Sequence, residues 1–118
     1  ILIGAQGQSL HIPPQLQFIA ERILKSPGRQ GTADNDINAM RNMGLLPKSY
    51  TVNHRFTDTN AWFIRTDVPD GTKMFDRVPL ATKMDEDFYT GNLLYKARER
   101  YAFGWSNWRQ WYGSNGST

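Results

Sequence analysis

The spacing of apolar residues changes near Pro47, and this change restricts the chain to a fold that mixes helices and strands. Between residues 16 and 24, apolar side chains recur every three or four positions, which predicts a half-buried amphipathic helix that Ser26-Pro27-Gly28 ends. From residue 50 onward they alternate with polar residues or gather in aromatic and β-branched runs, which predicts strands. A mixed helix-and-strand domain is therefore the first expectation.

The helical part follows a short extended segment at residues 8–12, where Pro13 and Pro14 stop strand pairing and suit the first turn of a helix. A second, shorter helix is predicted over residues 37–43. Its start would be capped by Asp34 or Asn35 and its end closed by Gly44. The buried side of this helix would carry Ile37, Met40 and Leu45.

The strand predictions depend on turn signals. Val68-Pro69-Asp70-Gly71 is a strong turn sequence between residues 61–66 and 73–78, so these two runs are predicted to pair as a hairpin. Residues 79–92 are mostly polar and are predicted to form a loop. The longest strand is predicted at residues 93–105.

The predicted strand at 93–105 has two chemically different faces. Lys96, Arg98 and Arg100 would share one face at intervals of about 6.6 Å, close to the spacing of phosphates along a nucleic-acid strand. This face is either a phosphate-tracking groove or a charged outer surface that keeps a sheet soluble. Glu99 would lie on the other, apolar face, where it needs a cation, hydrogen bonds or a proton, and its partner could belong to another chain.

Aromatic residues gather near the end of the chain, where Trp105, Trp108, Trp111 and Tyr112 stand close to Arg109. Such a cluster serves single-stranded nucleic acids, protein interfaces or the core of the domain itself. Packing within the domain is favoured, with a subunit contact next. The last residues, from 113 to 118, are predicted to be a frayed end.

The composition excludes several classes of protein. A chain of 118 residues has the size of one domain, and without cysteine it has no disulfide scaffold, thiolate zinc site or thiol nucleophile. No apolar run approaches the roughly 20 residues of a membrane helix, and the first residues do not resemble a signal peptide. The formal charge of +3 permits a polyanionic partner without requiring one.

No metal site is predicted. Asp34-Asn35-Asp36 imitates the start of a calcium loop, but Ala39 stands where glycine is required and Leu45 where a bidentate glutamate belongs. Helix capping explains the same residues more simply. The three acids at 85–87 are interpreted as a solvated loop.

No catalytic or cofactor site is predicted either. Gly4-Ala5-Gln6-Gly7 lacks the strand-to-helix context of a phosphate-binding loop. The two histidines, His11 and His54, fall on extended segments and are interpreted as ordinary strand residues rather than ligands. There is no sequence typical of a nucleophilic serine.

Several short segments stand in a fixed order along the chain and carry a resemblance to a known family. The first, Leu10-His11-Ile12-Pro13-Pro14-Gln15-Leu16 followed by an apolar helix, resembles a strand, two prolines and a helix near the middle of the major capsid proteins of tailed bacteriophages and prophages. Asn53-His54-Arg55-Phe56, residues 58–64 and residues 66–71 resemble the strands that follow. Residues 91–106 are similar to their C-terminal strand, which ends in a short aromatic-glycine tail.

The resemblance implies a C-terminal fragment of a major capsid protein with the Hong Kong 97-like fold, because the N-terminal arm, extended loop and spine helix of such subunits are not in the sequence. The implied fold class is α+β, with a central mixed β-sheet flanked by two helices. Residues 1–92 would form an axial-type domain. Residues 93–105 would return to the peripheral domain, and residues 106–118 would return to the axial domain and end in the frayed tail.

The same resemblance implies a structural role in the icosahedral shell that encloses the genome, in the virion, with assembly in the host bacterial cytoplasm. The partners would be other copies of the capsid protein, in pentamers and hexamers, and packaged double-stranded DNA on the inner face. No membrane, small-molecule substrate, cofactor or enzymatic activity is expected. Residues expected at subunit contacts or facing DNA are Arg29, Lys96, Arg98, Glu99, Arg100, Trp108 and Arg109.

Two alternatives remain open from the sequence. The first is a small nucleic-acid-binding module that uses the basic face of Lys96, Arg98 and Arg100 together with the terminal aromatic residues. The second is a small hydrolase built on His54 and nearby acids, which would need the imidazole within hydrogen-bond reach of a carboxylate in a cleft.

Overall fold

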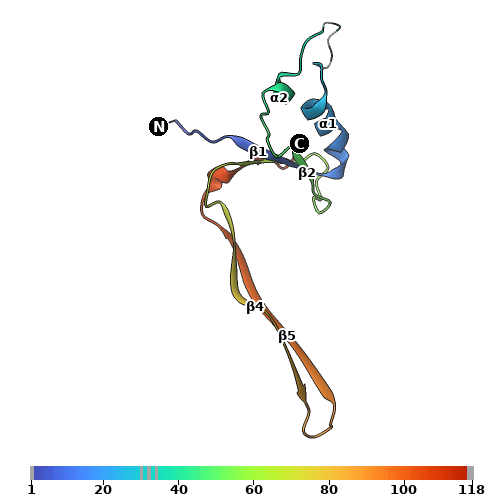
Figure 1. The fold of residues 1–118 in the computed structure, drawn as a ribbon, viewed down its shortest axis with the longest axis vertical. Coiled ribbons are helices and arrows are strands. Elements are labelled where there is room, and N and C mark those ends of the chain that lie inside the picture. Colours follow the sequence, from blue (N-terminus) through green and yellow to red (C-terminus); the bar gives the residue numbers. More distant parts are fainter. Residues whose placement is uncertain (1, 30, 32, 34, 117–118) are drawn as a thin grey trace. The chain divides into compact units, whose positions relative to one another are not determined.

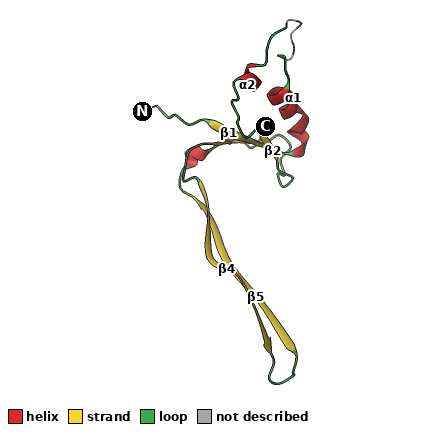
Figure 2. Ribbon diagram, viewed as in Figure 1, coloured by secondary structure: helices red, strands yellow, loops and turns green. Residues whose placement is uncertain are grey.

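The computed structural model describes residues 2–29, 31, 33 and 35–116, which fall into two compact units. One unit contains the described residues up to Gly71 together with those from Asn107 onward, and the other runs from Thr72 to Ser106. The first unit combines helices and strands (Figure 1). The second is a ribbon of two strands (Figure 2). The predicted α+β class is therefore confirmed.

The first unit is built on a four-stranded mixed sheet in the order β2-β1-β3-β6. Its strands are β1 (Gly7–Ile12), β2 (Tyr50–Val52), β3 (Trp62–Thr66) and β6 (Trp111–Ser114). β1 and β2 are parallel, whereas β3 runs antiparallel to both β1 and β6. Two parallel strands need a long crossover between them, and residues 13–49 supply it with the helices of the unit.

The predicted amphipathic helix is present in this crossover. Pro13 and Pro14 start a 3₁₀ turn, η1 (Pro14–Leu16), which continues directly as α1 (Gln17–Lys25). Ala20 of α1 is buried together with Ile12 of β1, Pro13 and Ala61, and these four are the buried apolar side chains among the described residues. The core of the unit is therefore small and lies between α1 and the sheet.

A polar contact ties α1 to the edge strand β2. The hydroxyl of Tyr50 donates to Glu21 Oε2 (2.6 Å), and Lys25 Nζ lies 3.0 Å from Glu21 Oε1 and 5.3 Å from the centre of the Tyr50 ring. The hydrogen bond from Tyr50, followed by that from Lys25, lowers the pKa of the Glu21 carboxyl. The hydrogen bonds therefore favour the ionised form of Glu21 at neutral pH.

The second helix, α2 (Ala39–Asn42), is shorter than predicted and is capped by a different residue. Asn38 Oδ1 accepts from the backbone N–H of Met40, and Asn38 Nδ2 donates to the carbonyl oxygens of Ile23 (2.7 Å) and Ser26 (3.0 Å). Capping by Asn35 was wrong because Asn38 caps the start of α2 while also bonding the last carbonyls of α1. Asp34, the other predicted cap, lies outside the described residues.

The predicted buried side of α2 was also wrong. The exposed fraction is 68% for Ile37, 40% for Met40 and 47% for Leu45, and only Met40 belongs to the helix. A helix of one turn presents too little surface to hold all three against the sheet. The positive φ of Gly44 does close the helix as predicted.

The predicted hairpin between residues 61–66 and 73–78 was wrong. Both edges of β3 are taken, one by β1 and the other by β6, so β3 has no free edge for the next strand. The turn sequence is real, with Asp70 at a φ of 59°, but it delivers the chain to β4 (Thr72–Glu86) in the other unit. A turn signal identifies a reversal and does not select the pairing partner.

The loop predicted from Pro79 was wrong as well, because β4 continues as a strand to Glu86 and pairs with β5 (Leu93–Trp105), whose bounds match the prediction. The register shifts twice, between Asp76 and Val78 and again between Val78 and Ala81. The second shift places Pro79, which has no N–H to donate, within a bulge.

The C-terminal segment is more ordered than predicted. A 3₁₀ turn, η2 (Trp108–Gln110), leads into β6, so Gly113 and Ser114 belong to a strand instead of a frayed end. A Cβ at Gly113 would overlap the carbonyl oxygen of Trp62, which explains why glycine stands where β6 crosses β3. Residues 117 and 118 lie outside the described part of the chain.

Candidate interaction surfaces

The ribbon of β4 and β5 has no core of its own. No residue from 72 to 106 is buried, and the two strands pair only with each other in the described chain. A two-stranded hairpin is at best marginally stable in water, and it needs a third strand or a packed face to persist. The ribbon therefore consists almost entirely of surface that a partner can cover.

One face of the ribbon is basic. Residues directly opposite each other on paired strands share a face, so the register places Lys83 beside Lys96 and Ala81 beside Arg98. We define the basic face by its five cations, Lys73, Lys83, Lys96, Arg98 and Arg100. Asp85 lies on the same face, with Oδ2 3.8 Å from Lys83 Nζ. The predicted cluster on β5 is thus confirmed and enlarged by two lysines from β4.

The pairing of Lys83 with Lys96 is informative. Like charges directly opposite each other destabilise a pair of strands. Lys96, Arg98 and Arg100 form no ion pair with any residue that the structure describes. Concentration of positive charge on this face is therefore unfavourable to the isolated ribbon and favourable to the binding of an acidic partner.

The other face of the ribbon is apolar and acidic, and we call it the apolar face. The apolar side chains on it, each more than half exposed, are Met74, Met84, Leu93, Tyr95, Tyr101, Phe103 and Trp105. Asp76, Glu86 and Glu99 lie among them. Glu99 lies on the apolar face as predicted, and it is exposed because nothing in the described residues covers this face.

The ribbon ends in a well-defined turn between Glu86 and Leu93. Asp87 accepts hydrogen bonds from the hydroxyl of Thr90 (2.6 Å) and from the backbone N–H of Tyr89 (3.2 Å), and the first, followed by the second, lowers the pKa of its carboxyl. Gly91 adopts a φ of 68° and donates to the Asp87 carbonyl. Of the three acids predicted to be in a solvated loop, only Asp87 is in the turn, because Asp85 and Glu86 belong to β4.

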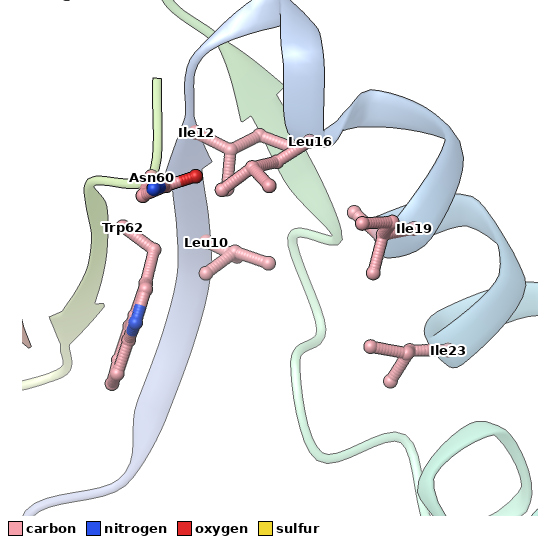
Figure 3. Close-up of a pocket in the computed structure, with 8 residues that line it drawn as sticks. Leu10, Ile12, Leu16, Ile19, Ile23, Asn60 and Trp62 are labelled. Atoms are coloured by element: carbon pink, nitrogen blue, oxygen red, sulfur yellow. The ribbon is translucent and has the colours of Figure 1, made fainter. Parts of the chain in front are cut away.

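In the first unit, an apolar hollow of about 360 Å³ lies between α1 and the sheet. Leu10 and Ile12 of β1 point toward Leu16, Ile19 and Ile23 on the helical side, and Trp62 of β3 forms the adjoining wall (Figure 3). The lining is almost free of polar groups, and Ile19 and Ile23 are about half exposed. The hollow lacks the ionisable groups that catalysis requires.

The predicted contact residue Arg29 lies beside Asp36, where two stretches of the crossover meet. Its backbone N–H donates to the Asp36 carbonyl (2.9 Å), and its guanidinium is 3.7 Å from the Asp36 carboxylate. Both side chains are more than half exposed, so this ion pair contributes little to stability. Of the stretch at residues 29–32, Arg29 and Gly31 are described, and residues 30 and 32 lie outside the described part.

The terminal aromatic residues divide between packing and exposure. The Trp111 ring packs 5.1 Å from His11, and Tyr112 lies 5.9 Å from Trp62, as packing within the domain requires. Trp108 is 65% exposed, with the Arg109 guanidinium stacked 4.9 Å from its ring. The two predicted contact residues at this end, Trp108 and Arg109, therefore form an exposed stacked pair.

Neither histidine has the surroundings of a catalytic group. His54 lies in an exposed turn after β2, instead of on a strand, and makes no hydrogen bond or ion pair to any described residue. His11 lies half-buried on β1 beside Ser9 Oγ (3.1 Å), and burial, followed by the charge of Arg65, lowers the pKa of its imidazole. The geometry that a hydrolase would need at His54 is not found.

Two further features concern the described residues as a whole. No cluster of three or more potential metal-ligating side chains occurs in this part of the chain. None of its helices is long and apolar enough to cross a bilayer.

Sequence reasoning missed the part of the two faces that β4 contributes. The missed residues include Lys73 and Lys83 on the basic face and Met74 and Met84 on the apolar face. A signal was present, because the tripeptide Thr-Lys-Met occurs at residues 72–74 and again at 82–84. The prediction of a loop from Pro79 onward concealed this repetition.

The comparisons with known proteins agree with the structural features. The family model described as phage capsid protein matches residues 2–114, which include both units. No curated protein and no solved structure matches the chain significantly. The comparisons lend no support to an independent nucleic-acid-binding module. The matched range covers nearly the whole chain, and members of this family have a structural role in the virion alongside other capsid subunits. The chain belongs to the phage capsid protein family.

Proposed function

We propose that this chain forms part of the shell of a phage or prophage head with the Hong Kong 97-like architecture, where it contacts further copies of itself in pentamers and hexamers. The observation that carries the proposal is the ribbon at 72–106, which has no buried residue although it holds a dozen exposed large apolar side chains. Surface of this kind is stable in water only when another protein segment covers it.

The proposed role needs no chemistry from the chain. Closed rings of identical subunits use heterologous contacts, in which one surface of a subunit meets a different surface of the next. Assembly would take place in the host cytoplasm, and one side of the finished shell would meet packaged DNA. The seven expected contact residues all have exposed side chains, which suit such contacts; they are Arg29, Lys96, Arg98, Glu99, Arg100, Trp108 and Arg109.

Electron cryo-microscopy of particles from the phage or prophage that encodes the chain tests this proposal. We expect the four-stranded sheet with α1, and the ribbon of β4 and β5, to fit density in the shell. We also expect the apolar side chains of the ribbon to be covered there. Particles whose shell contains another protein in place of this chain would refute the proposal.

A further inference from the structure

The two faces of the ribbon carry opposite charge. Among the residues whose face the register fixes, five cations and one carboxylate lie on the basic face and three carboxylates lie on the apolar face, while Arg77 stands in the first bulge and is assigned to neither. Arg98 and Glu99 illustrate the pattern, because they are neighbours in the sequence and point to opposite faces of β5. The ribbon is therefore polarised across its thickness.

This polarity selects one way for two ribbons to stack. If two apolar faces met, Asp76, Glu86 and Glu99 of one copy would approach the same acids of the other, and two basic faces would repel each other in the same way. An apolar face against a basic face brings carboxylates to cations instead. Charge thus disfavours a two-fold symmetric contact and favours a heterologous one, which propagates from copy to copy.

The side chains of the two faces are complementary in other respects. Tyr95, Tyr101 and Phe103 present aromatic rings on the apolar face, and the rings of Tyr101 and Phe103 contact each other at 5.4 Å. Lysine and arginine bind to such rings through cation–π contacts, and their aliphatic stems cover apolar surface while the charged ends reach carboxylates. The basic face therefore offers both of the groups that the apolar face can use.

The β4 edge of the ribbon is less suited to a partner than its faces. Pro79 removes one backbone donor from β4, and two bulges interrupt the same strand. Both features hinder the addition of a further strand along that edge. In the described ribbon, a partner can therefore cover the two faces or the regular edge of β5, but not readily the edge of β4.

We propose that the apolar face of the ribbon in one copy is covered by the basic face of the ribbon in a second copy. This inference rests on the proposed function, because it specifies one contact through which the shell subunits would associate. It assigns Glu99 as an acceptor on one copy and the cluster of Lys96, Arg98 and Arg100 as its counterpart on the next.

Two charge reversals test the stacking. Glu99→Arg replaces one of the three carboxylates of the apolar face with a cation, and Arg98→Glu places a carboxylate on the basic face, so either purified variant should self-associate roughly tenfold or more weakly than the wild-type chain in sedimentation velocity runs at low salt. An equimolar mixture should recover association, because both kinds of contact in an alternating stack are then complementary. Arg55→Glu, an exposed site in the first unit with the same change in charge, should associate as the wild type does.

Several outcomes would overturn the proposal. They are a wild-type chain that stays monomeric at the highest soluble concentration, single variants that associate normally, or a mixture that does not recover. Fluorescence anisotropy with a short DNA duplex tests whether the basic face binds DNA instead. If Arg98→Glu loses affinity for DNA but keeps self-association, the basic face binds DNA and the proposed stacking is wrong. Microscopy of the particle judges the proposed function separately, because shell density for this chain can be present without stacked ribbons.

Discussion

The two units differ in where their stabilising contacts come from. In the first unit, a buried centre holds Ile12 and Ala20 together, and hydrogen bonds from Tyr50 and Asn38 link the helices to their surroundings. In the ribbon, backbone pairing is extensive but no side chain is buried. Backbone pairing alone gives a hairpin only marginal stability in water. The first unit is therefore stabilised by its own side-chain contacts, whereas the ribbon needs a partner that covers it.

The largest expected effect comes from separating the two units. Thr72 and Trp105 pair at the base of the ribbon, so its two ends are adjacent and a short Gly-Ser linker can join Gly71 to Asn107. We expect the shortened chain to keep a cooperative urea unfolding transition, because its buried centre is unchanged. A synthetic peptide of residues 72–106 should show little strand signal by circular dichroism at micromolar concentration.

The opposite result for either piece would contradict this comparison. A shortened chain without a cooperative transition would mean that the first unit depends on the ribbon. A monomeric peptide with stable strand structure would mean that the ribbon needs no cover.

The second effect compares one large side chain in each unit. Ile12 is 2% exposed, so Ile12→Ala should lower the free energy of unfolding by about 2–5 kcal/mol, since it removes buried methylene groups and leaves a cavity. Met84 on the apolar face is 64% exposed, and Met84→Ala should change this free energy by no more than about 0.5 kcal/mol in the monomeric chain. Urea titration of the two variants measures both values, and similar losses for the two would remove the distinction between the units.

The elements that the sequence predicted well are those with uninterrupted periodicity. The helix around Ala20 keeps its apolar spacing over two turns, and β5 alternates from Leu93 to Trp105 with few exceptions, so both could be located without knowledge of their neighbours. The faces of β5 followed from the same alternation. The site residues on that strand, including Arg98, were therefore predicted together with the strand.

The elements that it missed depend on contacts between distant residues. Pro79 and two bulges break the alternation in β4, and only pairing with β5 shows that the strand continues through them. The partner of β3 could not be found from the turn at Asp70, because the competing strand β6 follows more than 40 residues later. Asn38 was overlooked as a cap because its second role, bonding the end of α1, is visible only in three dimensions. Assignment of the units to the axial and peripheral domains stays a prediction.

A third effect concerns the closeness of β6 to β3 within the first unit. Gly113→Ala should cost about 1–3 kcal/mol, because the added methyl group would overlap the Trp62 carbonyl and force the strands apart. Gly4→Ala is the matched control, since open space surrounds Gly4 and its replacement should have almost no effect. Thermal unfolding of both variants provides the measurement, and equal melting temperatures would show that β6 contributes nothing to the stability of this unit.

The smallest effect is a dependence on pH that the first unit should have and the ribbon should lack. The pKa of His11 is lowered in the folded chain, first by burial and then by the charge of Arg65, so the unfolded chain binds a proton more readily. The contribution of neutral His11 is complete above its ordinary pKa of 6.5 and is lost as the pH falls from there toward the lower folded value. Urea unfolding measured at intervals from about pH 7.5 to 5.5 should therefore show a free energy of unfolding that declines as the pH falls. Glu21 and Asp87, whose pKa values are also lowered, gain protons only below this range.

His11→Gln should flatten the profile, whereas His54→Gln, at the exposed turn, should leave the slope as it is in the wild type. A slope that survives the first substitution or disappears with the second would assign the dependence to another group and would leave His11 as a packing residue beside Trp111.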